Sequence, residues 1–389
     1  MRSLPVSLLV LAVLAAAFGV AGHAPGSPPA LAAAPPSPAG VKFLSDGVSL
    51  YPRLVRLEHQ AQGAYNGRII ASVVTFLGNE GLGAFFESRD DGLTFKRVST
   101  LADPGSAGGR GLCCSTLFEL PRALGRLPAG TLLWAASAGQ DAPQRRMSLP
   151  VWASRDQGRH WTRLGACARA AGTAGLWEPE FSVAADGALV CHYSDEGDAA
   201  HSQKLARVRS YDGLRWQDAS DTVTGAAPGE RPGMATVRRL ADGSYLMAYE
   251  LCGAPGQYNC AAQARASRDG WNWGDPAAPG ARVEASDGRY FTHAPTLNRD
   301  ARGRLYLIGQ ILNTRDGGVA GGNGRTAFTS TKPGGPWTAV TAPVPVPDAY
   351  DNYCPNYSSA LLPSLDGRRL LEVATNYDLG TCRASFGRN

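Results

Sequence analysis

Two isolated glutamates, Glu178 and Glu250, have the residue type and the setting for acid–base or nucleophilic chemistry. Glu178 lies in the aromatic and apolar segment 176–181 (LWEPEF), and Glu250 ends the apolar run 245–250 (YLMAYE). A carboxylate at the end of an apolar strand is costly to bury unless it has a partner or a task. Two such carboxylates at one site are the equipment of glycoside hydrolysis, in which one protonates the leaving oxygen and the other acts as nucleophile or base.

These glutamates break the symmetry of an internal repeat. Six units each contain two apolar runs around a small-residue turn with glycine, at Gly67, Gly130, Gly187, Gly243, Gly303 and Gly367. Nine residues before this glycine stand Glu178, Met234, Ala294 and Ser358, and seven residues after it stand Val74, Ser137, Ser194, Glu250, Gln310 and Ala374. Each position therefore holds one acid only. We expect both acids to reach one end of a central channel from neighbouring units.

A second repeat runs in phase with the first and predicts the architecture. Five segments have the Asp-box pattern of serine, aspartate, glycine and a final aromatic residue, at 88–95, 154–161, 210–216, 267–273 and, in a degenerate form, 330–337. In the first four, the aspartate can bond the turn backbone, and in all five glycine can adopt positive φ. Repeats at this spacing predict an all-β fold, a six-bladed β-propeller of four-stranded antiparallel blades. The Asp box should join the outer two strands of a blade, and residues 41–50 should supply the last strand of blade six.

Other polar and aromatic residues precede or begin the inner strands of this fold. The candidate substrate-binding residues are Arg53, Trp177, Glu180, Arg231, His293, Asp351, Asn356 and Tyr357, with Tyr353 as a third catalytic candidate. Aromatic rings and hydrogen-bonding groups around one opening suit a sugar, which has an apolar face and many hydroxyls. Two alternatives stay open: either acid could pair with Arg53 or Arg231 and only link blades, and Glu180 could replace Glu178 because the period of two places both on one strand face.

The N-terminus and the cysteines indicate an oxidising compartment. Residues 1–24 have the basic start, apolar stretch and small-residue end of a signal peptide, residues 25–40 form an Ala/Pro-rich leader, and 41–389 should be the propeller domain. The eight cysteines are compatible with disulfides. Cys252 is expected to bond Cys260, and Cys354 can bond Cys382. The partners of Cys113, Cys114, Cys167 and Cys191 cannot be deduced from the sequence. The expected location is extracellular or periplasmic.

Composition argues against several other classes of protein. The formal net charge of +5 comes almost wholly from arginine, and no basic run alternates with aromatic residues, so nucleic-acid binding is not expected. No second apolar run is long enough to span a membrane. A polysaccharide or oligosaccharide is the expected partner, and a monomer is the expected state.

The Asp boxes and the six units resemble the sialidase superfamily of propellers. Within it, segments 176–181, 231–237 (RPGMATV) and 249–253 (YELCG) resemble the exo-α-1,5-L-arabinanases of glycoside hydrolase family 93. This resemblance implies a retaining enzyme that releases arabinobiose from the non-reducing end of arabinan without a metal or other cofactor. It implies Glu178 as acid/base and Glu250 as nucleophile, with Tyr353 hydrogen-bonded to the nucleophile.

Two other functions stay open beside the exo-arabinanase. A sialidase would clamp its substrate carboxylate with three arginines, for which the chain has Arg53 and Arg231, but His293 stands where the third would be. A non-catalytic carbohydrate-binding propeller is the other alternative.

Overall fold

The computed structural model describes residues 41–389, and the predicted signal peptide and leader lie outside this range. The described chain is built from strands, with three short 3-10 turns, η1 (Gly63–Tyr65), η2 (Ala107–Gly109) and η3 (Gly256–Tyr258). The strands form the predicted six antiparallel blades, each with four strands of its own. The predicted fold class is therefore confirmed.

The first three blades each use four consecutive strands, numbered from the channel outward. Blade 1 contains β2 (Leu50–Arg56), β3 (Ile69–Leu77), β4 (Glu80–Ser88) and β5 (Lys96–Ala102). Blade 2 contains β6 (Leu112–Glu119), β7 (Leu132–Ala138), β8 (Ser148–Ser154) and β9 (Thr162–Arg169). Blade 3 contains β10 (Leu176–Val183), β11 (Leu189–Asp195), β12 (Lys204–Ser210) and β13 (Gln217–Val223). In all three, one unit of the sequence repeat makes one blade.

The fourth and fifth blades are joined by two extra strands. Blade 4 contains β14 (Arg231–Arg239), β15 (Tyr245–Cys252), β16 (Ala261–Ser267) and β17 (Ala281–Arg282). Blade 5 contains β19 (Thr296–Arg299), β20 (Leu305–Ile308), β22 (Thr326–Ser330) and β23 (Thr338–Thr341). Between them, β18 (Tyr290–Thr292) and β21 (Ile311–Asn313) pair with each other and extend the sheet of blade 4. The repeat pattern does not predict this addition.

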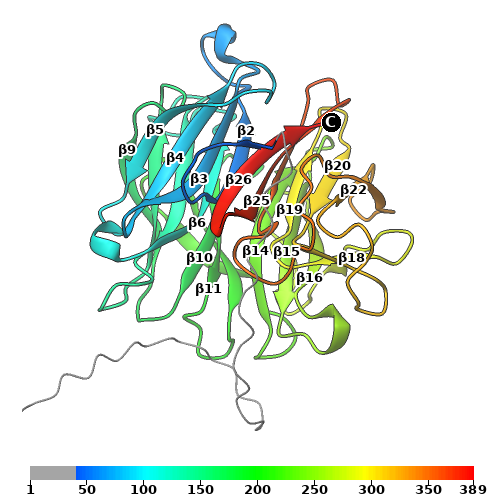
Figure 1. Ribbon diagram of the computed structural model, residues 1–389. Coiled ribbons are helices and arrows are strands. Elements are labelled where there is room, and N and C mark those ends of the chain that lie inside the picture. Colours follow the sequence, from blue (N-terminus) through cyan, green and yellow to red (C-terminus); the bar gives the residue numbers. More distant parts are fainter. Residues whose placement is uncertain (1–40) are drawn as a thin grey trace, which may run out of the picture. The chain divides into compact units, whose positions relative to one another are not determined.

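The sixth blade closes the ring with the start of the described chain. It contains β24 (Ala360–Pro363), β25 (Leu370–Asp378) and β26 (Thr381–Arg388), and its outermost strand is β1 (Lys42–Phe43). Lys42 pairs with Phe386, and the backbone of Ser49 still bonds Cys382. The first and last parts of the chain, blue and red in Figure 1, accordingly lie side by side. The predicted closing segment is correct up to its end, since Leu50 already begins β2.

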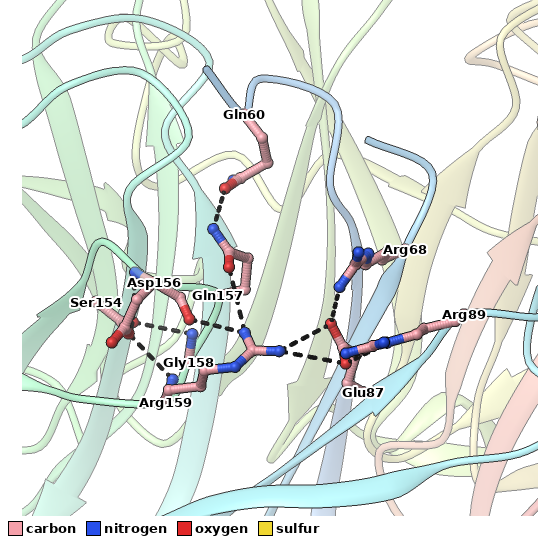
Figure 2. A network of polar contacts seen from close by, with 9 residues as sticks. All are labelled: Gln60, Arg68, Glu87, Arg89, Ser154, Asp156, Gln157, Gly158 and Arg159. Carbon is pink, nitrogen blue, oxygen red and sulfur yellow. Dashed lines mark hydrogen bonds and ion pairs between the residues drawn. The ribbon is translucent and has the colours of Figure 1, made fainter. Parts of the chain in front are cut away.

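The Asp boxes form the turns between the third and fourth strands of blades 1 to 5, as predicted. In the second box, Ser154 Oγ accepts a hydrogen bond from Gly158 N at 2.9 Å, and φ of Gly158 is +83°. Figure 2 shows this turn and the contact it makes with the preceding blade. Arg159 Nη2 lies 3.3 Å from Glu87 Oε1, and Glu87 also binds Arg68 and Arg89. The box therefore links blades 1 and 2 through a buried carboxylate.

Four disulfides contain all eight cysteines. Cys252 bonds Cys260 and Cys354 bonds Cys382, which confirms both predicted pairs. The other two bonds are Cys167–Cys191, between strands of blades 2 and 3, and Cys113–Cys114, between neighbours in the chain. In residues 41–389, no helix combines the length and apolar character needed to cross a bilayer.

Candidate active site

A ring of six residues with positive φ surrounds the end of the channel where the inner strands begin. One comes from each blade: Tyr51 (54°), Cys114 (61°), Glu178 (58°), Met234 (56°), Ala294 (46°) and Ser358 (56°). In blades 1 to 4 each lies at a register shift between the first and second strands. Such a β-bulge bends the strand and re-aims a side chain, and bulges are common next to active sites.

Glu178 is the one acid in this ring. Its Oε2 accepts hydrogen bonds from Ser194 Oγ at 2.7 Å and from the backbone N of Met234 in blade 4 at 2.8 Å. Its own backbone N donates to Ser137 Oγ in blade 2 at 3.1 Å. Burial raises the pKa of Glu178 more than these two donors and the charge of Arg53 lower it. Three blades therefore hold a carboxyl group that retains its proton more readily than a free glutamate.

Glu250 lies on the second strand of blade 4. Its Oε2 accepts a hydrogen bond from the backbone N of Ala294, in blade 5, at 2.7 Å. Burial and the nearby charge of Glu178 raise the pKa of Glu250 to about 8, against the opposing effect of the Ala294 N–H. The two carboxyl groups are thus electrostatic neighbours at one end of the channel. Because the charge of Glu178 disfavours ionisation of Glu250, the two groups form a coupled carboxyl pair.

Gly233 provides the space between the two acids. It pairs directly with Glu250 across β14 and β15. A Cβ atom added at Gly233 would lie 2.8 Å from Gln203 Nε2 and 3.4 Å from Glu178 Oε2. A larger residue would therefore press on Gln203 and on the Glu178 carboxyl group itself, which explains why the strand has glycine at this point.

Neither acid forms an ion pair with an arginine in the described part of the chain. Arg53 Nη1 donates to Ser358 Oγ at 2.9 Å, and its guanidinium lies 5.0 Å from the centre of the Tyr51 ring. Arg231 is bound to Glu196, with 2.5 Å between Nη2 and Oε1. The alternative in which Glu178 or Glu250 serves only as the ion-pair partner of Arg53 or Arg231 is therefore wrong.

Two tyrosines enclose the carboxyl pair. The rings of Tyr51 and Tyr357 meet edge to face with centroids 5.8 Å apart. Burial raises the pKa of both well above the usual tyrosine value, and the charges of Glu178 and Glu250 add to this effect. The hydroxyl of Tyr51 is buried and has no hydrogen-bond partner among the described residues. Tyr51 and Tyr357 are consequently neutral at physiological pH and placed beside both acids.

Trp177 lies next to this centre, with Arg145 above it. The Arg145 guanidinium is 5.3 Å from the centre of the Trp177 ring, within cation–π range. A Cβ atom added at Gly175 would collide with both Trp177 Nε1 and Glu196 Oε2, so these groups converge on one point. Glu196 in turn binds Arg231. Two predicted residues, Trp177 and Arg231, are therefore linked through an acid that was not predicted.

Three predicted residues come from the segments that precede the inner strands of blades 5 and 6. Tyr353 is 61% exposed, and its ring packs against Tyr377 at 6.4 Å between centroids. Its hydroxyl makes no hydrogen bond to Glu250, and Tyr357 takes the place beside Glu250 that was expected for Tyr353. His293 Nε2 lies 3.8 Å from the exposed carboxylate of Asp351, and burial lowers the pKa of His293 against the effect of this acid.

Glu180 and Asn356 form hydrogen bonds within the protein. Glu180 accepts hydrogen bonds from Thr116 Oγ1 at 2.8 Å and Arg238 Nη1 at 2.6 Å, and it lines a cavity of about 580 Å³ around the far ends of the inner strands. The bulge between Trp177 and Glu180 interrupts the strand, so the period of two does not place Glu180 beside Glu178. Asn356 is 1% exposed and bonds the backbone of Gly309 and Gln310.

Several residues of the site were not predicted. Tyr51, Cys114, Ser137, Ser194 and Glu196 belong to it, although Ser137 and Ser194 stood at the repeat position that identified Glu250. Tyr51 and Cys114 precede their turn glycines by sixteen residues rather than nine, because blades 1 and 2 have longer first loops. Alignment on the bulge instead of on the glycine would have found both.

Comparison with known proteins places the fold among glycosidase propellers. No protein-family model matches the sequence, and no curated protein matches it. An α-L-arabinanase of Penicillium chrysogenum, solved with arabinobiose, superposes with a TM-score of 0.72 at 25% identity over 90% of this chain and 96% of that one. An α-L-arabinofuranosidase of Fusarium graminearum, also solved with arabinobiose, gives 0.73 at 23% identity over the same shares.

The sialidase propellers are more distant in structure. The NanB sialidase of Streptococcus pneumoniae gives a TM-score of 0.58 at 10% identity, over 92% of this chain and 70% of that one. The resemblance inferred from the Asp boxes and from segments 176–181, 231–237 and 249–253 is confirmed at the level of the fold. The chain is a six-bladed propeller similar in structure to this arabinanase and to this arabinofuranosidase of glycoside hydrolase family 93.

Proposed function

We propose that this protein is a glycoside hydrolase. The observation that carries the proposal is the pair of Glu178 and Glu250, two buried carboxyl groups from neighbouring blades that interact at one end of the channel. Burial raises the pKa of both groups, and the charge of Glu178 adds to the effect on Glu250, so the pair can hold a proton for a general acid beside a carboxylate that acts as nucleophile. A propeller that only bound sugar would have no need of this coupled pair.

The proposed substrate is α-1,5-linked arabinan, cleaved from its non-reducing end to release arabinobiose. Support comes from the likeness to two propellers that were solved with arabinobiose. The enclosure of the acids by Tyr51, Tyr357 and Trp177 also suits a sugar, because aromatic rings cover its apolar faces. Tyr353, Asp351 and His293, which precede the inner strands of blades 5 and 6, are proposed to contact the sugar further from the bond that breaks.

The proposed mechanism retains the anomeric configuration. Glu178 protonates the glycosidic oxygen while Glu250 attacks the anomeric carbon, and Glu178 then takes a proton from the water that releases the sugar. Glu178 has two hydrogen-bond donors and Glu250 has one, which favours the proton on Glu250. The assignment therefore requires this proton to move to Glu178 when substrate binds. Retention also requires the carboxyl groups to be roughly 5 to 5.5 Å apart.

The arginines do not favour a sialidase. Arg53 is committed to Ser358 and to the Tyr51 ring, and Arg231 is neutralised by Glu196. The third clamp position holds His293, whose pKa is lowered by burial. A substrate carboxylate would find no free cluster of positive charge here. We infer further that the protein acts outside the cytoplasm, because four disulfides suit an oxidising compartment. A monomer remains the expected state.

Release of sugar from debranched arabinan tests the proposal, with sialyl-lactose and arabinogalactan as competing substrates. Glu178→Gln and Glu250→Gln should each lower kcat at least about a hundredfold, the lower end for loss of an acid–base group. Glu119→Gln is the matched control, because Glu119 is also buried but binds Gln60 and the backbone of Glu58 at the other end of β6. Activity of both site variants near that of the wild type would contradict the proposal.

Azide separates the two roles. With an aryl arabinofuranoside as substrate, azide should rescue Glu178→Ala and give the α-configured glycosyl azide, because the glycosyl-enzyme still forms on Glu250. Azide should rescue Glu250→Ala by attacking directly, which gives the β-configured product. The opposite pair of products would exchange the roles of Glu178 and Glu250 without changing the reaction class.

A further inference from the structure

The bond between Cys113 and Cys114 is the one feature of the site that the catalytic pair does not explain. A disulfide stabilises a fold mainly by closing a loop, and the effect grows with loop length. Cys167–Cys191 spans 24 residues and joins blades 2 and 3, whereas Cys113 and Cys114 are adjacent, with Cα atoms 3.8 Å apart. A bond between neighbours connects no two elements, so the stability of the propeller does not account for it.

The position of this disulfide points to the site. Cys114 is the blade 2 member of the ring of six residues with positive φ. It lies at the place that Glu178 occupies in blade 3. Its φ of +61° is a conformation that residues other than glycine and asparagine adopt rarely and at a cost. Strained backbone of this kind is concentrated at functional sites. The bond to Cys113 ties the side chain of Cys114 and fixes where its sulfur lies.

The residues around the disulfide are aromatic and apolar, as is typical of a surface that binds the face of a sugar. Cys113 pairs across the blade with Ser137, whose Oγ accepts the hydrogen bond from the backbone N of Glu178 at 3.1 Å. Cys114 belongs to the cluster that contains Tyr51 and Met234, with Trp177 and Tyr357 packed against it. Cys113 is half-buried, so the pair is not sealed inside the blade. Two bonded sulfurs form an apolar surface with no ionisable thiol beside the carboxyl pair.

We propose that the Cys113–Cys114 disulfide is a rigid apolar contact for the sugar residue bound against Glu178. Its sulfurs cover the C–H face of the furanose ring, while the hydroxyls of the sugar turn toward the polar groups of the opposite wall. This proposal rests on the proposed function, because it names a wall of the same binding site. It assigns binding and specificity, rather than proton transfer, to the disulfide.

A double variant, Cys113→Ala with Cys114→Gly, tests the contact. Alanine and glycine remove both sulfurs without leaving a thiol, and glycine accepts the positive φ at position 114. KM for linear arabino-oligosaccharides should rise about tenfold, which corresponds to about 1.4 kcal/mol, while kcat changes by less than about threefold and Tm is kept. The control, Cys167→Ala with Cys191→Ala, should lower Tm, because it opens a loop between blades, and should leave KM unchanged.

Each outcome decides one question. Unchanged KM in the Cys113→Ala, Cys114→Gly variant of an enzyme that cleaves arabinan overturns the contact and leaves the proposed function intact. A fall in kcat alone also overturns it, because the disulfide would then position Glu178 through Ser137. A wild-type protein that cleaves no arabinan overturns the proposed function and the contact together. If the first variant does not fold, Cys113→Ser with Cys114→Ser gives the same comparison.

Discussion

The backbone nitrogen of Ala294 donates a hydrogen bond to Glu250 Oε2 at 2.7 Å, so the acid of blade 4 is held by the residue with positive φ at the start of blade 5. The same relation recurs one blade earlier, where Met234 N of blade 4 binds Glu178 of blade 3. In both, the donor is the residue with positive φ, which turns its N–H toward the preceding blade. The packing of successive blades thus builds the site, because each acid is bound by the backbone of the next blade.

The interaction of the two acids predicts a pH dependence. Burial and the charge of Glu178 raise the pKa of Glu250 to about 8, so activity should fall as the pH rises through that value and the proton of the pair is lost. Glu178→Gln removes the second of these causes and should lower the pKa of Glu250. NMR titration of the carboxyl carbons would measure it, with Glu119→Gln as control. An unchanged pKa in Glu178→Gln would mean that the two carboxyl groups do not interact.

The space at Gly233 gives a second prediction. In Gly233→Ala the new Cβ would approach Gln203 Nε2 to 2.8 Å and Glu178 Oε2 to 3.4 Å, so the side chains around Glu178 must shift. We expect kcat/KM on arabinan to fall about tenfold to a hundredfold, the effect of misplacing a catalytic group by about 1 Å. Gly229→Ala is the matched control, because nothing lies within 4 Å of its Cβ. Equal activity of both variants, with folding verified by Tm, would show that Gly233 does not govern the position of Glu178.

The fold was predictable because its units repeat, and the two acids stood out because they break that repeat. Asp boxes and turn glycines recur in phase, and the position seven residues after the glycine identified Glu250 without any structural information. Glu178 was found by the same logic from the other side of the glycine. An acid at a position where the other blades have no acid is a much stronger signal of function than a single acid in a sequence without repeats.

The bulges made the other residues of the site difficult to predict from the sequence. A bulge adds residues to one strand, so counting by twos across it gives the wrong face. Glu180 was expected beside Glu178 for this reason, but it binds Arg238 instead. Longer first loops displaced Tyr51 and Cys114 from the counted position. Asn356 was predicted to bind sugar, but its side-chain amide donates a hydrogen bond to the backbone of Gly309. Such differences depend on tertiary contacts that a strand pattern does not record.

Buried Glu372 should make the fold less stable as the pH rises. It is fully buried, Oε2 accepts a hydrogen bond from Val344 N, and Oε1 has no partner in the described chain. Burial raises the pKa of Glu372 to about 8 against the effect of Val344 N–H. The native state then keeps a proton that the unfolded state releases near its ordinary pKa. Between these two values the free energy of unfolding should fall by about 1.4 kcal/mol per pH unit from this group.

Glu372→Gln should remove this dependence. The amide keeps an oxygen for Val344 N and carries no charge, so the variant should match the wild type near pH 5 and exceed its stability near pH 8. Denaturant unfolding at a series of pH values measures the difference. A variant less stable than the wild type at about pH 8 would show that Glu372 is ionised and paired in the native state.

Glu87 should have the opposite effect on stability. Burial alone would raise the pKa of Glu87, but the hydrogen bonds from Arg68 and Arg89 and the charge of Arg159, all visible in Figure 2, outweigh burial and lower it. A carboxylate with a lowered pKa stabilises the native state above its unfolded pKa, and this contribution is lost as the pH falls through the native value. Glu87→Gln should therefore lower the free energy of unfolding by about 1.5–3 kcal/mol at neutral pH, the range for hydrogen bonds to a charged group.

The control for Glu87 is another glutamate of the same blade. Glu58 is exposed and forms no ion pair within residues 41–389, so Glu58→Gln should change stability by less than about 0.5 kcal/mol. Below about pH 4 the deficit of Glu87→Gln should shrink, because the wild-type carboxylate then gains a proton. Thermal unfolding from neutral to acid pH measures both variants. A deficit that stays constant over this range would mean that packing, rather than the charge of Glu87 between blades 1 and 2, stabilises this contact.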